Sequence, residues 1–428
     1  MKVVHLSTSI SRSSANFRLH RALLAQGVES SILVQGKSTE DENIHYAKKG
    51  AKRELQEKTR GRFFRLFLRR WDKLPADIPF SHGQTGTDVS KYPLIRQADI
   101  IHLHWVCNYL SVDTIQKLIA TGKPIVWTCH DSWPFTGGCH VWLWRGCRRY
   151  EKECGECPLL PHQRKYDITK YVYKSKKKHW RKNQISFIAP SNWMKRNISQ
   201  SSLFSKNRCE VIPNTINPKT FSPLSEEEIQ RRCGYQKEKG KLHLLFGAES
   251  VNTPYKGFEY LLTVLEELLE KEPEFAENTV LHIIGAGEST APVLQNYECH
   301  YWGFVRDEEK MAAIYNIADI YVYPSIDDNL PNMIMESLAC GTPVAAFDTG
   351  GITDLVEHKQ NGYIAEYKNA GQLMEGILWI ARNNPENHLG KNGRNKVEEA
   401  YNPERIAREH IRLYKSLLEE NTWQEKRN

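Results

Sequence analysis

The sequence predicts an α/β protein with two doubly wound parallel sheets, and three observations carry this prediction. The chain has 428 residues, which exceeds one ordinary domain and suits two of about 200 residues each. Short apolar runs alternate with helical patterns in both halves, as in folds whose parallel strands are joined by helices. A hydrophobic content of 40% and a charged content of 26% are globular values. We therefore expect two similar domains with a ligand cleft between them.

The first half follows a Rossmann-like order of strands and helices. Apolar runs predict strands at residues 3–6, 31–34, 99–105, 124–129 and 185–189. Amphipathic patterns predict helices at residues 15–26 and 112–120, and a long basic excursion follows the second strand. These elements make up the expected N-terminal domain, residues 1–205.

The second half repeats this order and forms the expected second domain, residues 206–402. Its predicted strands are residues 242–247, 280–284, 319–323 and 343–347. Its predicted helices are residues 258–270 and 308–318 and a short helix after residue 330. The junction is expected between residues 199 and 214. A closing helix at residues 403–420, within the C-terminal segment 403–428, is expected to cross back onto the first domain.

Two acids, Asp328 and Glu336, flank the start of the short helix. They follow a predicted parallel strand, and ligands of open α/β sheets bind beyond the carboxyl ends of the strands. Pro331 suits a first helical turn, so the free amides near Asn332 and Met333 would face an anion, with the positive end of the helix dipole behind them. This arrangement predicts a diphosphate site.

The two acids have different expected partners. Glu336 lies about one turn into the helix and could accept the hydroxyl protons of a ribose. Asp328 precedes the helix and could reach the hydroxyls of an attached sugar. A capped helix with two solvated carboxylates is the alternative interpretation. Together with the diphosphate site, the pattern indicates a nucleotide-sugar site.

At these residues the chain resembles the retaining glycosyltransferases of family 4, whose signature is two acids eight positions apart in such a setting. Asp328 stands where the family usually has Glu, and its shorter carboxylate keeps the charge and the acceptor capacity. The resemblance extends over essentially the whole chain and is strongest from residue 242 to residue 364. It implies the GT-B fold, in which two Rossmann-like domains face each other across a cleft.

The resemblance also implies roles in the second domain. Lys256 would offset the charge that builds on a departing nucleoside diphosphate; the family commonly adds an Arg five residues earlier, where this chain has Val251. Phe304 and Val305 lie in a segment that matches the family's base-binding segment, where main-chain groups read the base edge. Gly285 would allow a close backbone approach to the ligand.

In the first domain, His130 resembles the family's strand-end histidine, which faces the transferred sugar. Its implied role is a hydrogen bond to a donor hydroxyl or to the developing oxocarbenium-like centre. A structural histidine is the alternative. Asp131 could orient His130 or the acceptor, and His104 and Trp105 are expected to line the acceptor side. The family's glycine-rich first loop corresponds here to residues 7–14, which contain no glycine.

Four of the ten cysteines are clustered, with the pattern C-x7-C-x6-C-x2-C. These are Cys139, Cys147, Cys154 and Cys157, in a stretch that resembles a subset of family 4 enzymes of the exopolysaccharide and colanic-acid type. Four thiolates suffice for a closed structural zinc site, and His140 could replace one ligand. Reduced thiols or disulfides are the alternatives, because only the last spacing is typical of zinc.

Two segments concentrate the basic excess behind the formal charge of +8. Residues 60–71 place aromatic side chains near one helical face and arginines elsewhere, as a helix docked on an anionic membrane would. Residues 164–182 carry nine Lys or Arg with interleaved aromatic residues. Either lipid phosphates or nucleic acid could bind such a segment. An ordinary amphipathic helix packed on its own domain is the alternative for each.

The chain has no apolar run of roughly 18 residues and begins directly with a predicted strand, so a cytoplasmic protein, peripheral at the inner face of the plasma membrane, is expected. No cofactor is expected for catalysis, since no Asp-x-Asp motif offers ligands for a diphosphate-bound metal.

The main hypothesis is a retaining glycosyltransferase that moves a sugar from a nucleotide-sugar donor to a hydroxyl of a lipid-linked bacterial surface glycan. One alternative is a nucleotide-sugar epimerase of related fold. Another is a nonenzymatic adaptor that binds nucleic acid or membrane. The coexistence of Glu336, Lys256 and His130 disfavours the adaptor, so no nucleic-acid partner is expected.

Overall fold

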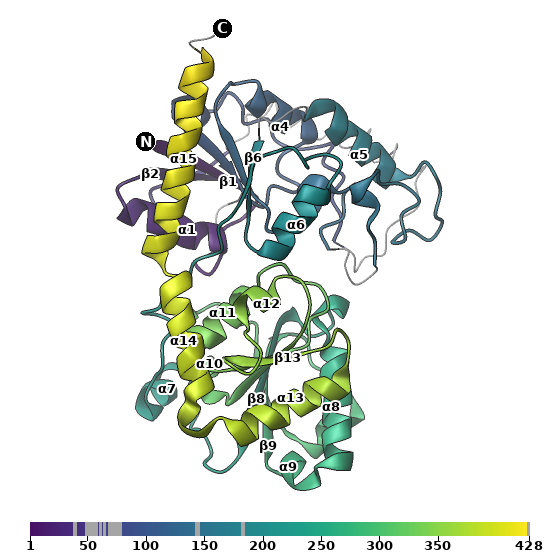
Figure 1. Cartoon of the computed structure of the whole chain (residues 1–428), viewed down its shortest axis with the longest axis vertical. Coiled ribbons are helices and arrows are strands. Elements are labelled where there is room, and N and C mark those ends of the chain that lie inside the picture. Colours follow the sequence, from purple (N-terminus) through teal and green to yellow (C-terminus); the bar gives the residue numbers. More distant parts are fainter. Residues whose placement is uncertain are drawn as a thin grey trace. The chain divides into compact units, whose positions relative to one another are not determined.

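The computed structural model describes residues 1–36, 41–47, 59, 62, 66, 79–141, 146–180 and 185–425. The chain divides into two compact units (Figure 1). Unit 1 is Met1–Pro213 with Pro403–Asn428, and unit 2 is Asn214–Asn402. The division falls after Pro213 and not after residue 205, because strand β7 (Cys209–Val211) pairs with β6 (Ile185–Ala189) in the first sheet.

Unit 1 holds a seven-stranded sheet in the order β3-β2-β1-β4-β5-β6-β7, and every recorded pairing is parallel. Its remaining strands are β1 (Lys2–Ser7), β2 (Glu29–Val34), β3 (Ile44–Tyr46), β4 (Ile100–Leu103) and β5 (Ile125–Thr128). Its helices are α1 (Ala15–Ala25), α3 (Pro93–Gln97), α4 (Val112–Ile119), α5 (Ile168–His179), α6 (Asn192–Gln200) and α15 (Pro403–Glu425). This is the Rossmann strand order: successive strands are added on one side of β1 up to β3, and from β4 onward they are added on its other side.

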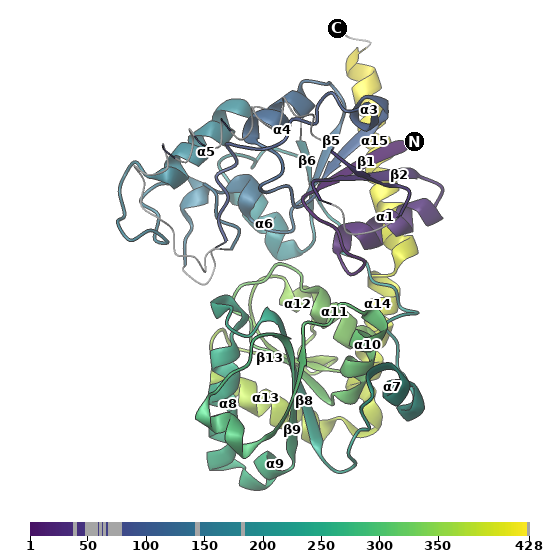
Figure 2. The same cartoon turned by 180° about the vertical axis from the view of Figure 1, so that it is seen from behind.

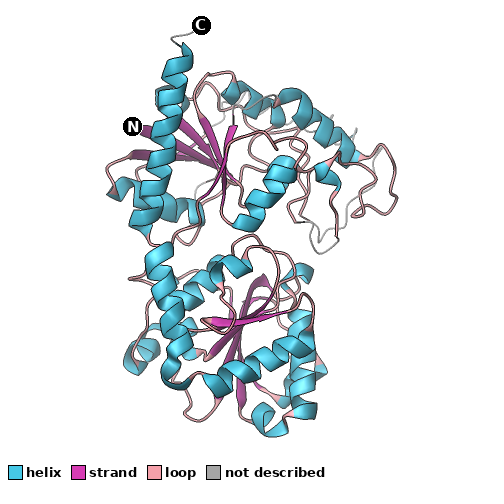
Figure 3. Cartoon of the chain, in the orientation of Figure 1, coloured by secondary structure: helices cyan, strands magenta, loops and turns pink. Residues whose placement is uncertain are grey.

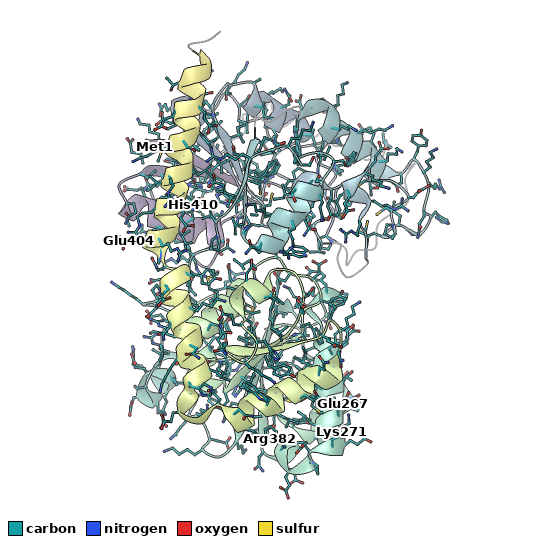
Figure 4. All side chains as sticks on the ribbon, in the orientation of Figure 1. Met1, Glu267, Lys271, Arg382, Glu404 and His410 are labelled. Atoms are coloured by element: carbon teal, nitrogen blue, oxygen red, sulfur yellow. The ribbon has the colours of Figure 1, made fainter. Side chains whose placement is uncertain are left out.

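Helix α15 returns to unit 1 and completes its core. Leu413 and Tyr414 pack with Leu19 and Leu23 of α1 in one buried cluster. The Tyr414 hydroxyl also bonds Nδ1 of His102 on β4 at 2.6 Å. His410, labelled in Figure 4, lies near the same histidine, with ring centroids 5.8 Å apart. The last helix of the chain therefore covers a sheet formed by the first half.

Unit 2 repeats the same order as a six-stranded parallel sheet, β10-β9-β8-β11-β12-β13. Figure 2 labels β8, β9 and β13 of this sheet. Its strands are β8 (Leu242–Ser250), β9 (Thr279–Ala286), β10 (Glu298–Gly303), β11 (Ile320–Tyr323), β12 (Val344–Phe347) and β13 (Gly362–Ala365). Its helices are α7 (Glu226–Cys233), α8 (Phe258–Lys271), α9 (Pro273–Glu277), α10 (Glu308–Ile317), α11 (Asn332–Ala339), α12 (Ile352–Leu355), α13 (Ala370–Asn383) and α14 (His388–Ala400). Helices lie on both sides of each sheet (Figure 3). The predicted class, two doubly wound parallel sheets, is confirmed.

Two glycines of unit 2 allow the loops around the carboxyl end of β11 to pack closely. Gly257, before α8, has φ +75°, and a Cβ there would lie 1.9 Å from the carbonyl oxygen of Pro324. Gly350, after β12, has φ +58°, and a Cβ there would lie 1.6 Å from the carbonyl oxygen of Asp328. Only glycine fits such approaches, and both fix the backbone that carries Asp328.

Helix α11 begins at Asn332, one residue later than expected. Pro331 is its N-cap and not its first-turn residue, and Gly341 follows the C-cap Cys340 with φ +82°. The predicted stop signal therefore acts as expected. Within the described residues, no helix is long and apolar enough to cross a membrane.

Candidate functional site

A cluster of three polar side chains lies at the carboxyl ends of the strands of unit 2. The Lys256 Nζ is 2.5 Å from Oδ2 of Asp328 and 3.2 Å from the Tyr323 hydroxyl. The Tyr323 hydroxyl donates to the same Asp328 oxygen at 2.6 Å. The three residues come from the turn before α8, the end of β11 and the loop before α11. We call them the Lys256 cluster.

The electrostatics of the Lys256 cluster keep its lysine charged. Burial acts to lower the pKa of Lys256, but the charge and hydrogen bond of Asp328 outweigh it and raise the pKa. Burial and the neighbouring Asp328 both raise the pKa of Tyr323, which therefore stays protonated and donates. The cation predicted to face a diphosphate is thus held by the acid predicted to face the sugar. An arriving phosphate would compete with Asp328 for it.

The first turn of α11 begins shortly after Asp328 of this cluster. Its N-cap Pro331 offers no side-chain acceptor, so the first-turn amides are open to solvent or to a ligand. Asn332 is held by a 3.0 Å bond from the Asn214 side-chain amide. Met333 packs so tightly against β8 that a Cβ at Gly247 would lie 2.3 Å from its Cε. These contacts fix the position of the first two residues of α11.

Glu336 lies deeper in α11 than the sequence suggested. It is 5% exposed, and its Oε2 accepts a hydrogen bond from the Tyr315 hydroxyl at 3.0 Å. Burial and then the charge of Glu336 raise the pKa of Tyr315, which keeps this hydroxyl a donor. Tyr315 is a site residue that sequence reasoning missed, because its helical pattern marks it as a core residue. Contact of Glu336 with a ribose stays a prediction.

The remaining donor-side residues have mixed surroundings. Gly285 has φ +141°, and a Cβ there would meet the carbonyl oxygen of Ala248 at 2.6 Å, so the glycine serves strand packing. Phe304 is 56% exposed at the end of β10, with the Arg306 guanidinium 5.6 Å from its ring centre. Val305 packs against the unit 2 core. The exposed ring makes this segment available to a ligand.

In unit 1, His130 follows β5 and ends a chain of hydrogen-bonded imidazoles. Its Nε2 lies 3.1 Å from Nδ1 of His104, whose Nε2 lies 2.9 Å from Nδ1 of His5. Burial lowers the pKa of His130 to about 4 and lowers those of His104 and His5 well below the usual value. His130 is therefore a neutral hydrogen-bonding group. His104 is 3% exposed with both ring nitrogens engaged, so it supports His130, and its place on the acceptor side stays a prediction.

Asp131 is paired with a histidine that the sequence analysis considered only as a metal ligand. Its Oδ2 lies 2.5 Å from Nδ1 of His140, and the other ring nitrogen of His140 lies 3.0 Å from the Ser81 hydroxyl. Burial opposes ionisation of Asp131, but the charge and hydrogen bond of His140 hold its pKa below the usual value. Trp105 is 39% exposed, and its indole N–H lies 3.3 Å from the same Nδ1. An exposed aromatic ring beside a carboxylate suits a sugar.

The same residues argue against a cation at this place. The ligand atoms of Cys107, Asp131 and His140 lie within 4.8 Å of one another. Nδ1 of His140 donates its proton to the Asp131 carboxylate, so this nitrogen has no lone pair for a metal, and the indole N–H of Trp105 also faces it.

The four clustered cysteines are free thiols in one neighbourhood. Burial raises the pKa of Cys154 to about 12 and of Cys157 to about 11, while backbone N–H groups of Gly137 and Leu159 act in the opposite direction. The donor set suits zinc. In the described part of the chain, however, the groups with ligand atoms within 4.8 Å are Cys107 with Asp131 and His140, and three buried histidines. Zinc binding would have to draw the four sulfurs closer together.

Comparison with known proteins identifies the class. The family model "Glycosyltransferase Family 4" matches residues 15–220, and "Glycosyl transferases group 1" matches residues 241–383. Sucrose-phosphate synthase from Thermosynechococcus elongatus superimposes with a TM-score of 0.66 at 18% identity, covering 97% of this chain and 99% of that one. WaaG, a glycosyltransferase of lipopolysaccharide biosynthesis, gives 0.57 at 13% identity, covering 95% and 98%. The chain therefore has the two-domain fold of the GT-B glycosyltransferases, and each of its halves matches a glycosyltransferase family model.

Curated relatives extend the similarity in sequence. The chain is 33% identical over 205 residues to an uncharacterized glycosyltransferase of Haemophilus influenzae, covering 46% of this chain and 52% of the relative. It is 25% identical over 292 residues to the putative colanic acid biosynthesis glycosyl transferase WcaC of Escherichia coli, covering 66% of each. The alignments therefore span about half to two thirds of these relatives.

The buried histidines of unit 1 predict acid sensitivity. His130, His20 and His410, with pKa values lowered to about 4 mainly by burial, take up a proton only on unfolding. Below about pH 6.5 the unfolded chain thus binds more protons, and the free energy of unfolding falls by up to about 1.4 kcal/mol per pH unit for each histidine. Urea unfolding between pH 7 and pH 4.5, followed by tryptophan fluorescence, checks this. A stability independent of pH over that range would contradict it.

For the cysteine cluster, we predict one equivalent of zinc in freshly purified protein and its loss in Cys154→Ser with Cys157→Ser. Because burial raises the pKa values of these thiols, zinc must displace protons, and its affinity should increase with pH. Elemental analysis and a chelator titration measure both effects. Less than half an equivalent of zinc, with all four thiols of the cluster open to alkylation, would discard the site. Cys233→Ser, in unit 2, is the matched control.

Proposed function

We propose that the protein transfers a sugar, with retention of anomeric configuration, from a nucleotide-sugar donor to a hydroxyl of a lipid-linked intermediate of a bacterial surface polysaccharide. The observation that carries the proposal is the Lys256 cluster, which precedes the open first turn of α11 at the carboxyl edge of the unit 2 sheet. A lysine held by a single carboxylate and a helix start without a side-chain cap are both suited to receive a diphosphate.

The proposed step needs no group other than the two substrates. The bond between the anomeric carbon and the diphosphate oxygen breaks, and the acceptor oxygen bonds to that carbon on the same face. The acceptor proton goes to the departing diphosphate. Lys256 balances the charge that develops on the diphosphate, and this frees Asp328 to accept hydrogen bonds from the sugar hydroxyls.

In unit 1, His130 would contribute as a neutral imidazole. With its pKa lowered to about 4 by burial, it can hydrogen-bond a sugar hydroxyl or the electron-poor ring without adding charge. Trp105 and Asp131 would bind the acceptor, the ring by stacking and the carboxylate by accepting hydroxyl protons. His130→Ala should therefore lower turnover more than donor affinity.

The donor and acceptor classes rest on similarity. A structure of Anabaena HepE in complex with UDP and glucose superimposes with a TM-score of 0.58 at 14% identity, covering 97% of this chain and all of that one. WcaC is named for the biosynthesis of colanic acid. We therefore propose a nucleotide-sugar donor, with uridine diphosphate sugars as the first probes, and a glycan acceptor.

A cytoplasmic location at the inner face of the plasma membrane would give access to a lipid-linked acceptor. Exposed basic and aromatic residues gather at α5 and the loop before it, among them Tyr166, Lys174, Lys177 and Lys178. Lys176, Tyr173 and Trp180 of the same segment are buried, so only part of the predicted basic stretch faces outward. Apart from Arg62 and Leu66, the second predicted segment, 60–71, lies outside the described residues.

The donor site is tested by thermal shift with nucleoside diphosphates. UDP should raise the melting temperature of the wild type, because a ligand that binds only the native state stabilises it. Glu336→Gln should weaken binding about tenfold, since a charged acceptor of hydroxyl protons is lost. Glu375→Gln, on the exposed face of α13, should bind as the wild type does. Absence of any shift with UDP, GDP, ADP and CDP would refute the donor site, and unchanged binding by Glu336→Gln would refute its role.

Membrane docking is tested by vesicle sedimentation. Replacing Lys174, Lys177 and Lys178 with Glu should reduce partition onto vesicles containing phosphatidylglycerol, because each lysine near an anionic surface contributes about 1 kcal/mol. Deleting residues 62–71 should reduce it further. Glu replacements of Lys391, Lys396 and Lys415, on α14 and α15, serve as the control. Partition that both changes leave intact would reject the idea.

A further inference from the structure

A hydrogen-bonded row of side chains crosses the unit 2 sheet from β10 to the loop before β8. The indole N–H of Trp302 donates to Nδ1 of His282 at 3.2 Å. Nε2 of His282 lies 3.0 Å from Nδ1 of His243, and Nε2 of His243 lies 3.2 Å from the carbonyl oxygen of Glu238. We call Trp302, His282 and His243 the Trp302 relay.

The direction of every hydrogen bond in the relay is determined. An indole N–H can only donate, so Nδ1 of His282 carries no proton. Burial lowers the pKa of His282 to about 3 and also lowers that of His243, so both rings are neutral, with one proton each. His282 therefore donates from Nε2 to His243, which donates from Nε2 to the carbonyl of Glu238. Both histidines are fully buried, and their four ring nitrogens are all used.

The relay ends at an irregularity in the sheet. Tyr301 pairs with Ile283 and Gly303 pairs with Ile284, so Trp302 is an extra residue of β10 without a partner on β9. Gly303 follows with φ +65°, and the chain then leaves the sheet with the exposed Phe304. Such bulges bend a strand and redirect the side chains that follow. The hydrogen bond from Trp302 to His282 fixes the side chain of this extra residue.

We propose that His282 and His243 are positioning residues for recognition of the nucleotide base: through Trp302 they fix the bulge that places the backbone of Phe304 and Val305. The inference rests on the proposed nucleotide-sugar donor site. The phosphate and ribose would be bound elsewhere, at the Lys256 cluster and Glu336. Loss of the relay should therefore weaken recognition of the base and leave the binding of a ribose diphosphate unchanged.

Two ligands separate these contributions in isothermal titration of the full chain. UDP carries the base, and ribose 5-diphosphate lacks it. The Kd of ribose 5-diphosphate divided by the Kd of UDP therefore measures the part of the affinity that the base supplies. His282→Leu removes the acceptor of the indole, and Trp302→Phe removes the donor. His282→Asn keeps an acceptor close to the Nδ1 position. His300→Leu is the matched control, because His300 stacks on His282 at 5.4 Å but bonds Glu298 instead of the relay.

We expect the ratio to fall about fivefold or more in His282→Leu and Trp302→Phe, the effect of about one hydrogen bond. It should recover in His282→Asn and stay unchanged in His300→Leu, while the Kd of ribose 5-diphosphate stays within about twofold throughout. If His282→Leu does not fold, Trp302→Phe decides.

Two results would overturn the inference while the donor site stands. One is an unchanged ratio in Trp302→Phe and His282→Leu, and the other is an equal weakening of both ligands, which marks a purely structural role. A wild type that binds UDP no better than ribose 5-diphosphate would overturn it as well. A wild type that binds neither of these ligands, nor GDP, ADP or CDP, would refute the proposed function itself.

Discussion

The ion pair between Lys256 and Asp328 is the interaction on which the candidate site depends. Removing two charges from water is costly, and such a pair persists only when further hydrogen bonds satisfy it. The Tyr323 hydroxyl supplies one such bond to Asp328. Close approaches of Gly257 to the Pro324 carbonyl and of Gly350 to the Asp328 carbonyl hold the backbone of this loop in place. The pair holds a cation and a hydrogen-bond acceptor next to each other. A bound donor would separate them, with Lys256 contacting the diphosphate and Asp328 contacting the sugar.

Both units contain a row of buried, neutral histidines. In unit 1 the row from His5 to His130 keeps a strand-end imidazole uncharged. In unit 2 the row from His243 to His282 fixes the end of β10. Both rows cross parallel strands in the interior, where burial lowers the pKa values and leaves each ring one donor and one acceptor. These rings therefore orient their neighbours without bringing charge into the core.

The sequence predicted the central strands and α11 because their signals are local: continuous apolar runs, and Pro and Gly at the helix ends. It did not predict β10 or β13, since these strands are partly polar and partly exposed and are identified only by their pairing. It named Lys256 and Asp328 but not their contact, because 72 positions separate them. His140 was missed as the partner of Asp131 for a different reason: the two residues are 9 positions apart, but the irregular backbone between them follows no helical or strand period. Tertiary contacts of this kind have no periodic signature.

The most direct test of the account is a crystal structure of the full chain with UDP. We expect the diphosphate at the first turn of α11, with the Lys256 ammonium turned from Asp328 toward a phosphate oxygen and the ribose hydroxyls at Glu336. A nucleotide bound at another place, with the contact between Lys256 and Asp328 unchanged, would contradict the account.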